Sequence, residues 1–240
     1  MKNILVPTTL QHDTLYSVKA AIKQSAGANC IITLILLNEA PDAESAAYYL
    51  RKTKYINTTS QCVVLDNCRS VAYGAGNCRL EVHNQYGLSA PLLKNLLEHL
   101  HTNLIIIPAS YKRENSKIHH YFLSLLANSK IPMLHLTRDC EEKDLNKALY
   151  LEHDKTNIGV HELQQHINTQ FSFKIVSHAT IGEQYPNELG AQITEAISKN
   201  NIDLLIETRK PEKIRNKNKG VTVNDTLGLP VLSIYEEAVL

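Results

Sequence analysis

Short apolar runs alternate with amphipathic stretches along most of the chain. Apolar runs rich in β-branched residues are typical of buried parallel strands, and apolar positions at three- and four-residue spacing predict helices. The predicted strands cover residues 3–7, 31–37, 78–84, 104–107, 131–136, 148–151, 173–176, 203–206 and 229–234. The predicted helices cover residues 14–26, 46–50, 63–71, 89–101, 121–128, 160–167 and 189–197. This alternation predicts an α/β fold with parallel sheets covered on both faces.

The same order of elements occurs twice, which indicates a tandem duplication. The last predicted strand of each half carries the same pattern, Ile131-Pro-Met-Leu134 in the first and Leu229-Pro-Val-Leu232 in the second. An acidic link joins the halves. We therefore predict two domains, residues 1–140 and a smaller one at residues 145–240.

The composition is that of an ordinary globular chain and excludes several classes. Of 240 residues, 43% are hydrophobic and 20% charged, so disorder is not expected. No apolar run approaches the roughly 20 residues of a spanning helix, and the start MKNILVPTTL lacks the apolar stretch of a secretory signal. We expect a cytoplasmic protein with no membrane association.

Charge and cysteine spacing argue against two further classes. The net charge of +1 lacks the basic excess of a nucleic-acid-binding domain. The cysteines do not show C-x2-C spacing, which predicts ordinary thiols rather than metal ligands. These thiols are Cys30, Cys62, Cys68, Cys78 and Cys140. The chain also lacks the phosphate-loop, dinucleotide and nucleophile-elbow motifs, so an enzyme is less expected than a binding protein.

Three segments together resemble the universal stress protein family. They are Asn3-Ile-Leu-Val-Pro-Thr8, Asn103-Leu-Ile-Ile-Ile107 and Ser129-Lys-Ile-Pro-Met-Leu134. The resemblance covers residues 1–138 and extends to residues 146–236. It implies two tandem Rossmann-like domains, of the adenine nucleotide alpha hydrolase-like type, whose last strands pair with each other. It also implies adenine-nucleotide binding in one branch of the family and none in another.

The first half departs from the nucleotide-binding pattern, which has an acidic residue after the first strand and a G-x2-G-x9-G-[ST] loop after the fourth. Thr9, beside Thr8, stands at the acidic position, and no glycine lies between Gly87 and Gly159. Glycines let backbone N–H groups converge on a phosphate. We therefore expect the ATP loop to be lost here, with Thr8 and Thr9 as weak ligand-binding candidates.

The second half offers different candidates. Asp154 falls at the acidic position, and a basic stretch that begins with Arg209 and Lys210 follows the fourth predicted strand without paired glycines. This stretch is either a solvated loop or a phosphate clamp. Asp154, Arg209 and Lys210 are thus the second-half candidates for binding ATP or another adenine nucleotide.

Two other clusters have ordinary explanations. The adjacent His119 and His120 do not share a helix face, so we expect no metal site. Tyr48, Tyr49 and Tyr55 either line a pocket or partner surface or pack along one helix.

The leading interpretation is a non-enzymatic, universal-stress-protein-like protein of the stress response that acts as a ligand-sensing or partner-binding scaffold. Its partners would be a small molecule or another protein, and two chains would form a homodimer. The alternative is an ATP-binding protein with weak hydrolysis that uses the second-half site. A third possibility is an unrelated small ligand at the carboxyl ends of the strands.

Overall fold

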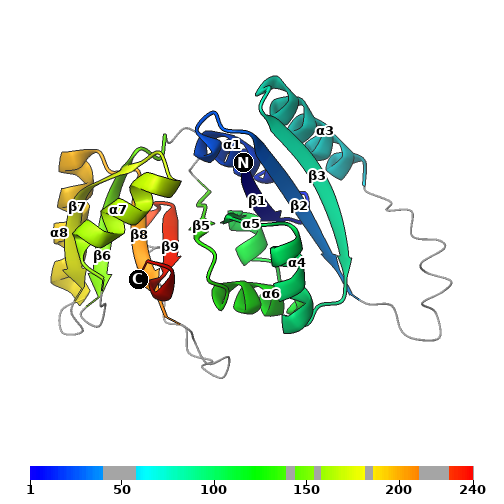
Figure 1. The fold of residues 1–240 in the computed structure, drawn as a ribbon. Helices are drawn as coiled ribbons and strands as arrows, with labels where there is room; N and C mark the ends of the chain where they lie inside the picture. Colours follow the sequence, from blue (N-terminus) through cyan, green and yellow to red (C-terminus); the bar gives the residue numbers. More distant parts are fainter. Residues whose placement is uncertain (40–57, 139–143, 154–157, 182–185, 211–226, 240) are drawn as a thin grey trace. The chain divides into compact units, whose positions relative to one another are not determined.

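The computed structural model describes residues 1–39, 58–138, 144–153, 158–181, 186–210 and 227–239 (Figure 1). Its strands are β1 (Lys2–Pro7), β2 (Cys30–Asn38), β3 (Cys78–Tyr86), β4 (Leu104–Ile107), β5 (Met133–His135), β6 (Lys147–His153), β7 (Lys174–Ile181), β8 (Leu204–Arg209) and β9 (Val231–Tyr235). Its helices are α1 (Thr14–Ser25), α3 (Thr59–Gly74), α4 (Ala90–His99), α5 (Ala109–Lys112), α6 (Lys117–Ala127), α7 (Val160–Gln170), α8 (Pro186–Asn200) and the 3-10 helix η1 (Glu236–Ala238). The predicted α/β class is confirmed.

The chain divides into two compact units, residues 1–126 and 127–240. The first unit holds four parallel strands in the order β3-β2-β1-β4. The interior of these strands is buried, and Val6 on β1, Leu34 on β2 and Ile105 on β4 are fully inaccessible. Continuous apolar strands of this kind are buried on both faces, as expected for a parallel sheet.

Local signals explain where the helices of the first unit begin and end. Thr58 and Gln61 form a reciprocal capping box at the start of α3. At the end of α1, Ala26 takes the left-handed conformation at φ 50° and its N–H donates to the carbonyl of Lys23. Gly27 follows, also at positive φ. The helix therefore ends at Ser25, one residue before the end of the predicted helix at residue 26.

The segment after β4 differs from the sequence prediction. It was expected to be a polar stretch up to a helix at residue 121, but the short helix α5 lies directly after Pro108 and α6 already begins at Lys117. Proline before a helix fixes φ and needs no hydrogen-bond partner for its nitrogen. The buried side chains of Tyr111 and Phe122 contribute the packing that the polar composition did not reveal.

The second unit has the strand order β5-β9-β8-β6-β7. β9, β8, β6 and β7 pair in parallel, whereas β5 and β9 pair antiparallel with Leu134 opposite Leu232. Its core cluster consists of Leu149, Leu151, Ile193, Ile202, Leu205, Leu229 and Val231. The antiparallel pair confirms the expectation that the last strands of the two repeats associate.

The strand orders reveal the repeat in three dimensions. β7-β6-β8 in the second unit follows the same order as β2-β1-β4 in the first. β3 and α3 have no counterpart among the described residues of the second unit, where just four residues separate the end of β7 at Ile181 from the start of α8 at Pro186. The second copy is therefore the smaller one, as predicted.

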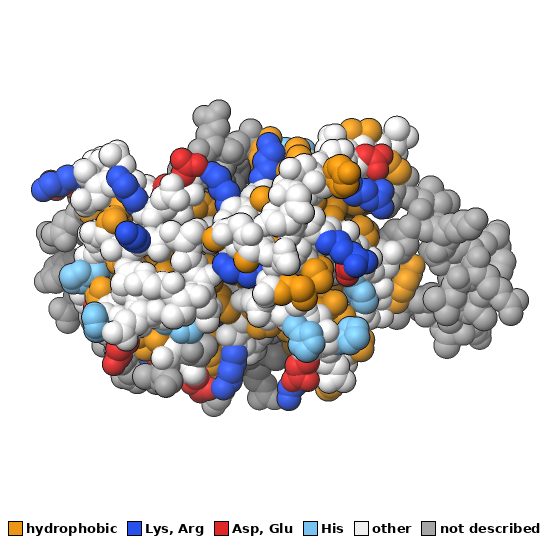
Figure 2. Space-filling model, turned by 45° about the horizontal axis from the view of Figure 1, so that its top comes forward, with side chains coloured by type: hydrophobic (Ala, Val, Ile, Leu, Met, Phe, Trp, Pro, Cys, Tyr) orange, Lys and Arg blue, Asp and Glu red, His pale blue; other side chains and the backbone are white. Residues whose placement is uncertain are grey.

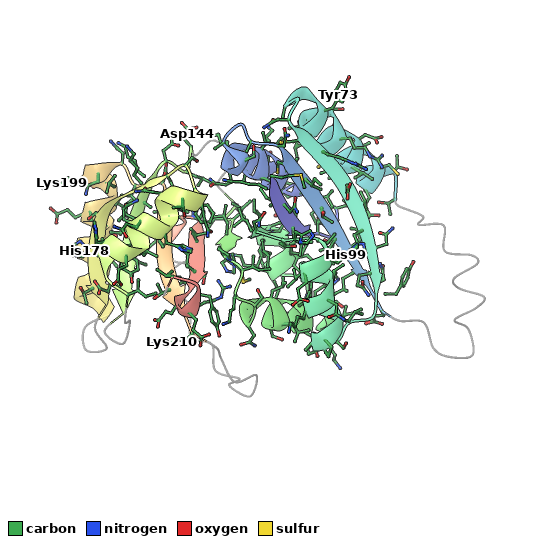
Figure 3. All side chains as sticks on the ribbon, in the orientation of Figure 1. Tyr73, His99, Asp144, His178, Lys199 and Lys210 are labelled. Atoms are coloured by element: carbon green, nitrogen blue, oxygen red, sulfur yellow. The ribbon has the colours of Figure 1, made fainter. Side chains whose placement is uncertain are left out.

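The surface is mixed in character. On the face shown in Figure 2, lysine and arginine side chains lie scattered among acidic, polar and hydrophobic ones. Tyr73, which is 89% exposed, projects from the end of α3 (Figure 3). None of the described helices is both long and apolar enough to traverse a lipid bilayer.

Candidate functional site

The strand order of the first unit points to one candidate site. In open parallel sheets, ligands bind beyond the carboxyl ends of the strands at the point where the strand order reverses. In β3-β2-β1-β4 this point lies between β1 and β4. We call residues 8–14, which follow β1, and residues 108–111, which follow β4, the β1/β4 switch point.

A carboxylate bridges the two halves of the β1/β4 switch point. Asp13 stands at the N-cap of α1 but makes no side-chain cap there. Its Oδ2 accepts from the backbone N–H of Ser110 at 2.7 Å and its Oδ1 accepts from Ser110 Oγ at 2.6 Å. Ser110 lies in the first turn of α5, and the preceding Pro108 has no side-chain acceptor to cap that helix. Asp13 therefore caps α5 from 97 residues away.

The two threonines after β1 have different environments. Thr8 is buried, and its hydroxyl contacts Thr14 Oγ1 at 2.6 Å and accepts from the N–H of Leu10 at 2.8 Å. These bonds fix the turn in which Leu10 takes a positive φ of 57°. The hydroxyl of Thr9, by contrast, is buried and has no hydrogen-bond partner in the described part of the chain, although its carbonyl accepts from Gln61 Nε2 at 3.2 Å.

An aromatic pair supports the β4 side of the switch point. The Tyr111 hydroxyl lies 2.8 Å from His119 Nδ1, and the rings meet edge to face at 4.9 Å between centroids. Burial, together with the charge of Glu114, raises the pKa of Tyr111. Burial lowers the pKa of His119, with Glu114 opposing this effect. Both groups are therefore neutral at physiological pH, and His119 serves as a hydrogen-bonding partner of Tyr111.

This arrangement is electrostatically unfavourable for an anion. The N–H group of Ser110 already donates to the Asp13 carboxylate. A phosphate placed there could not use this donor and would be repelled by the negative charge of Asp13. Two unit charges 4 Å apart repel by about 4 kcal/mol at an effective dielectric constant of about 20. Sequence reasoning placed Thr9 at the acidic position but missed Asp13. Its position at the start of a predicted helix was the available signal.

In the second unit, the predicted ligand residue Arg209 is held by backbone carbonyls. Its guanidinium donates to the carbonyl oxygens of Ala127, Ser129, Ile131 and Ser233, two of these contacts being 3.2 and 2.9 Å long. It also lies 5.8 Å from the centre of the Tyr235 ring. Burial lowers the pKa of Arg209 to about 10, and Glu207 opposes this shift, so the group keeps its charge at neutral pH.

Of the other two second-half candidates, the structure describes Lys210 but not Asp154. Lys210, labelled in Figure 3, directly follows the last residue of β8, and its Nζ lies 3.3 Å from Glu236 Oε2. Asp154 lies outside the described residues, as do Tyr48, Tyr49, Tyr55 and Cys140. The structure thus brings Arg209 and Lys210 together at one strand end, Thr8 and Thr9 at another, and does not place Asp154.

Metal-ligating side chains are dispersed over the described part of the chain. No group of three or more His, Cys, Asp or Glu residues there could hold an ion. His119 is buried against Tyr111 whereas the adjacent His120 is exposed, so the two point in different directions as the sequence predicted.

Comparisons with known proteins agree with this fold. Neither a family model nor a curated protein matches the chain. Among solved structures, a universal stress protein from Archaeoglobus fulgidus DSM 4304 is 11% identical, with a TM-score of 0.54 over 98% of both chains. A functionally unknown protein from Pseudomonas aeruginosa PAO1 is 13% identical, with a TM-score of 0.51 over 100% of this chain and 94% of its own.

A third similar structure, titled a putative universal stress protein from Pseudomonas aeruginosa UCBPP-PA14, is 11% identical and has a TM-score of 0.49 over 100% of this chain and 95% of that one. At these identities the likeness concerns the fold. The first of these structures matches over nearly its whole length, so the likeness extends through both units. The chain therefore has the fold of the universal stress proteins, with the second copy of the repeat shortened.

Proposed function

We propose that this chain is a non-enzymatic binding protein of the stress response, a ligand-sensing or partner-binding scaffold whose first unit does not take adenine nucleotides. The observation that carries the proposal is the Asp13 carboxylate on the Ser110 N–H and hydroxyl, at 2.7 and 2.6 Å. An ATP site needs convergent N–H donors at this place. Here the Asp13 carboxylate already accepts the hydrogen bond of the Ser110 N–H.

Two further features support a scaffold rather than a catalyst. No glycine lies between Gly87 and Gly159, so the backbone after β4 carries side chains throughout. Tyr111 and His119, on the β4 side of the switch point, are buried against each other rather than poised for proton transfer. The unpaired hydroxyl of Thr9 remains as a hydrogen-bonding group that a small uncharged ligand could engage.

The proposal is tested by native mass spectrometry of the purified chain with and without Mg-ATP, AMP and cAMP, alongside an ATP hydrolysis assay. We expect no nucleotide adduct and no hydrolysis above that of buffer. A stoichiometric nucleotide adduct located in the first unit, or hydrolysis above that of buffer, would overturn the proposal.

A matched set of variants then locates any binding. Loss of an ATP adduct in Asp154→Ala would support the alternative second-half nucleotide site, with Arg209 released from its carbonyls to reach the phosphates. Loss in Thr9→Val with retention in Asp154→Ala would place the nucleotide in the first unit instead. The exposed Asp66→Ala is the control, since its carboxylate pairs with Arg69 on the surface of α3.

A further inference from the structure

A row of three residues crosses the first unit at the amino ends of its strands. Lys2 on β1 pairs in register with Cys30 on β2, and Cys30 pairs in register with Cys78 on β3. Side chains of directly paired residues in a parallel sheet point to the same face. The two thiols are therefore neighbours, with the Lys2 ammonium on the far side of Cys30.

The spacing of such a pair suits a covalent bond. Neighbouring strands lie about 4.8 Å apart, and disulfide-linked residues have Cα atoms about 4.4 to 6.8 Å apart. The register is continuous from Cys30↔Cys78 to Asn38↔Tyr86, so the two residues are held opposite each other by the whole length of the β2–β3 ladder. The pairing therefore places the two Cα atoms within the range that disulfides span.

Hydrogen bonds around the pair fix its geometry further. The Cys30 N–H donates to the carbonyl of Asn77 at 2.9 Å, and Asn77 Nδ2 donates to the carbonyl of Ala28 at 2.8 Å. The Cys78 thiol donates to Asn77 Oδ1 at 3.6 Å and lies 4.0 Å from Ser25 Oγ. The connection between α3 and β3 thus anchors both cysteines.

The two thiols differ in exposure. Cys30 is 3% exposed, whereas Cys78 lies on the edge strand and is partly accessible. Burial, with a smaller contribution from the neighbouring Cys78 thiol, raises the pKa of Cys30 to about 12. An oxidant in solution therefore meets Cys78 first, and Cys30 is placed to react second.

We propose that Cys30 and Cys78 form a peroxide-reactive dithiol that closes to a reversible disulfide between β2 and β3. The Cys78 thiolate attacks hydrogen peroxide, the O–O bond breaks, hydroxide leaves, and the sulfur becomes a sulfenic acid. Cys30 then attacks that sulfur, the S–O bond breaks, and the second oxygen leaves as water. In total, two thiols and one peroxide give one disulfide and two waters. Thiols of the glutathione type reverse the reaction by exchange.

The full-length chain tests this directly. It is treated with hydrogen peroxide, its remaining thiols are alkylated, and it is digested for peptide mapping by mass spectrometry. We expect a peptide pair joined through Cys30 and Cys78 that disappears on treatment with dithiothreitol, and a loss of two of the five thiols. A peroxide-treated chain with both residues alkylated, or with either joined to another cysteine, would overturn the proposal.

Serine variants separate the two roles and provide the control. Cys62→Ser/Cys68→Ser/Cys140→Ser should retain the full yield of the cross-link, whereas Cys78→Ser should abolish it. Cys30→Ser should accumulate a sulfenic acid at Cys78 that dimedone traps, and the unmodified chain should show far less of it. Cross-linking that survives in Cys78→Ser, or the lack of any dimedone adduct in Cys30→Ser, would contradict the proposed order. Circular dichroism confirms that each variant is folded.

Discussion

Asp13 and Arg209 each direct a charge at backbone groups that are distant in the sequence. Asp13 accepts from the first turn of α5, and Arg209 donates to carbonyls at the end of α6 and in the segment before β5. Charged groups strengthen such hydrogen bonds, and a backbone group that loses its partner in a buried place is costly. Both side chains are therefore expected to contribute to stability whether or not they bind a ligand.

Replacing Asp13 tests its role as a cap. We expect Asp13→Ala to lower the free energy of unfolding by about 1–2 kcal/mol, because the start of α5 loses its acceptor. Asp13→Asn keeps an acceptor oxygen and should cost less. Urea titration followed by circular dichroism measures both. Asp66→Ala, on the exposed surface of α3, is the control. An effect of Asp13→Ala no larger than that of the control would refute the capping role.

Arg209 can be tested against its neighbour. Arg209→Ala leaves four carbonyl oxygens without their donor, and we expect a loss of roughly 2–4 kcal/mol in urea titration. Arg209→Lys keeps the charge but cannot span the same acceptors, so an intermediate loss is expected. Lys210→Ala removes a partly exposed ion pair with Glu236 and should cost about 1 kcal/mol or less. Equal losses for Arg209→Ala and Lys210→Ala would contradict this structural role.

His119 gives the chain a dependence on pH. Burial lowers the pKa of His119 in the folded state from the ordinary value of 6.5, with Glu114 and Glu39 opposing and His120 adding to the shift. As the pH falls through 6.5, the unfolded chain takes up the proton first, so the free energy of unfolding declines. Above that pH both states are neutral and the effect is absent. Burial lowers the pKa of His166 as well, which adds to the same decline.

The histidine prediction is checked by urea titration at about pH 7.5 and 5.5. His119→Gln can still hydrogen-bond Tyr111 but does not titrate, so the decline should become smaller while that due to His166 remains. His99→Gln, at an exposed position of α4, should leave the decline unchanged. A decline identical in His119→Gln and the unmodified chain would rule His119 out as a source.

At the scale of elements, β5 and β9 form an antiparallel pair, whereas the other strand pairs described above are parallel. The pairing places Leu134 opposite Leu232, and both side chains are about 2% exposed or less. β9 is buried throughout its length and also pairs with β8, so it is a central strand of the second unit. A substitution that disrupts β9 should therefore destabilise β5 and β8, the two strands that pair with it.

A truncation in β9 measures this contribution. We expect Leu232→Ala to lower the free energy of unfolding by about 2–4 kcal/mol, since it leaves a cavity in a packed strand. Val176→Ala on β7, where the side chain is 45% exposed, is the matched control and should cost less than about 1 kcal/mol. If both variants unfold at the same urea concentration, β9 does not hold the second unit together.

Strands and most helices could be predicted because their apolar periodicity is strong, as in Ile31–Leu37 and Leu92–Leu100. The helix α5 and the early start of α6 were missed because they depend on tertiary partners: Asp13 caps one, and Tyr111 packs on His119 and Phe122. The contacts of the Arg209 guanidinium with backbone carbonyls were missed for the same reason, because three of its four acceptors lie 78 to 82 residues earlier in the chain. Ligand roles for Thr8, Thr9, Asp154, Arg209 and Lys210 stay predictions.

At the scale of the whole molecule, the pairing of β5 with β9 bears on oligomeric state. The resemblance implied that the last strands of the two domains pair with each other, and this pairing occurs here within one chain. A homodimer therefore needs another surface, for which β3, at one end of the first unit's strand order, and β7, at one end of the second unit's, are the natural candidates.

Light scattering at micromolar concentration tests the homodimer. A mass of about twice 27.0 kDa would support it, and a mass near 27.0 kDa would contradict it. A charged substitution on β7, Val176→Lys, should weaken a dimer built through that strand but leave one built through β3 intact. If the chain is a monomer, the light-scattering mass of Val176→Lys should stay near 27.0 kDa.

The position of β3 at the end of the first unit's strand order gives the Cys30–Cys78 pair a mechanical consequence. Among the described strands, β3 pairs with β2 alone, so one ladder of backbone hydrogen bonds holds it, whereas an interior strand such as β1 is held by two. A bond between Cys30 and Cys78 would therefore fasten a terminal strand to its neighbour at the amino end of that ladder. Oxidation should slow the separation of β3 from β2 more than it alters the interior of the sheet.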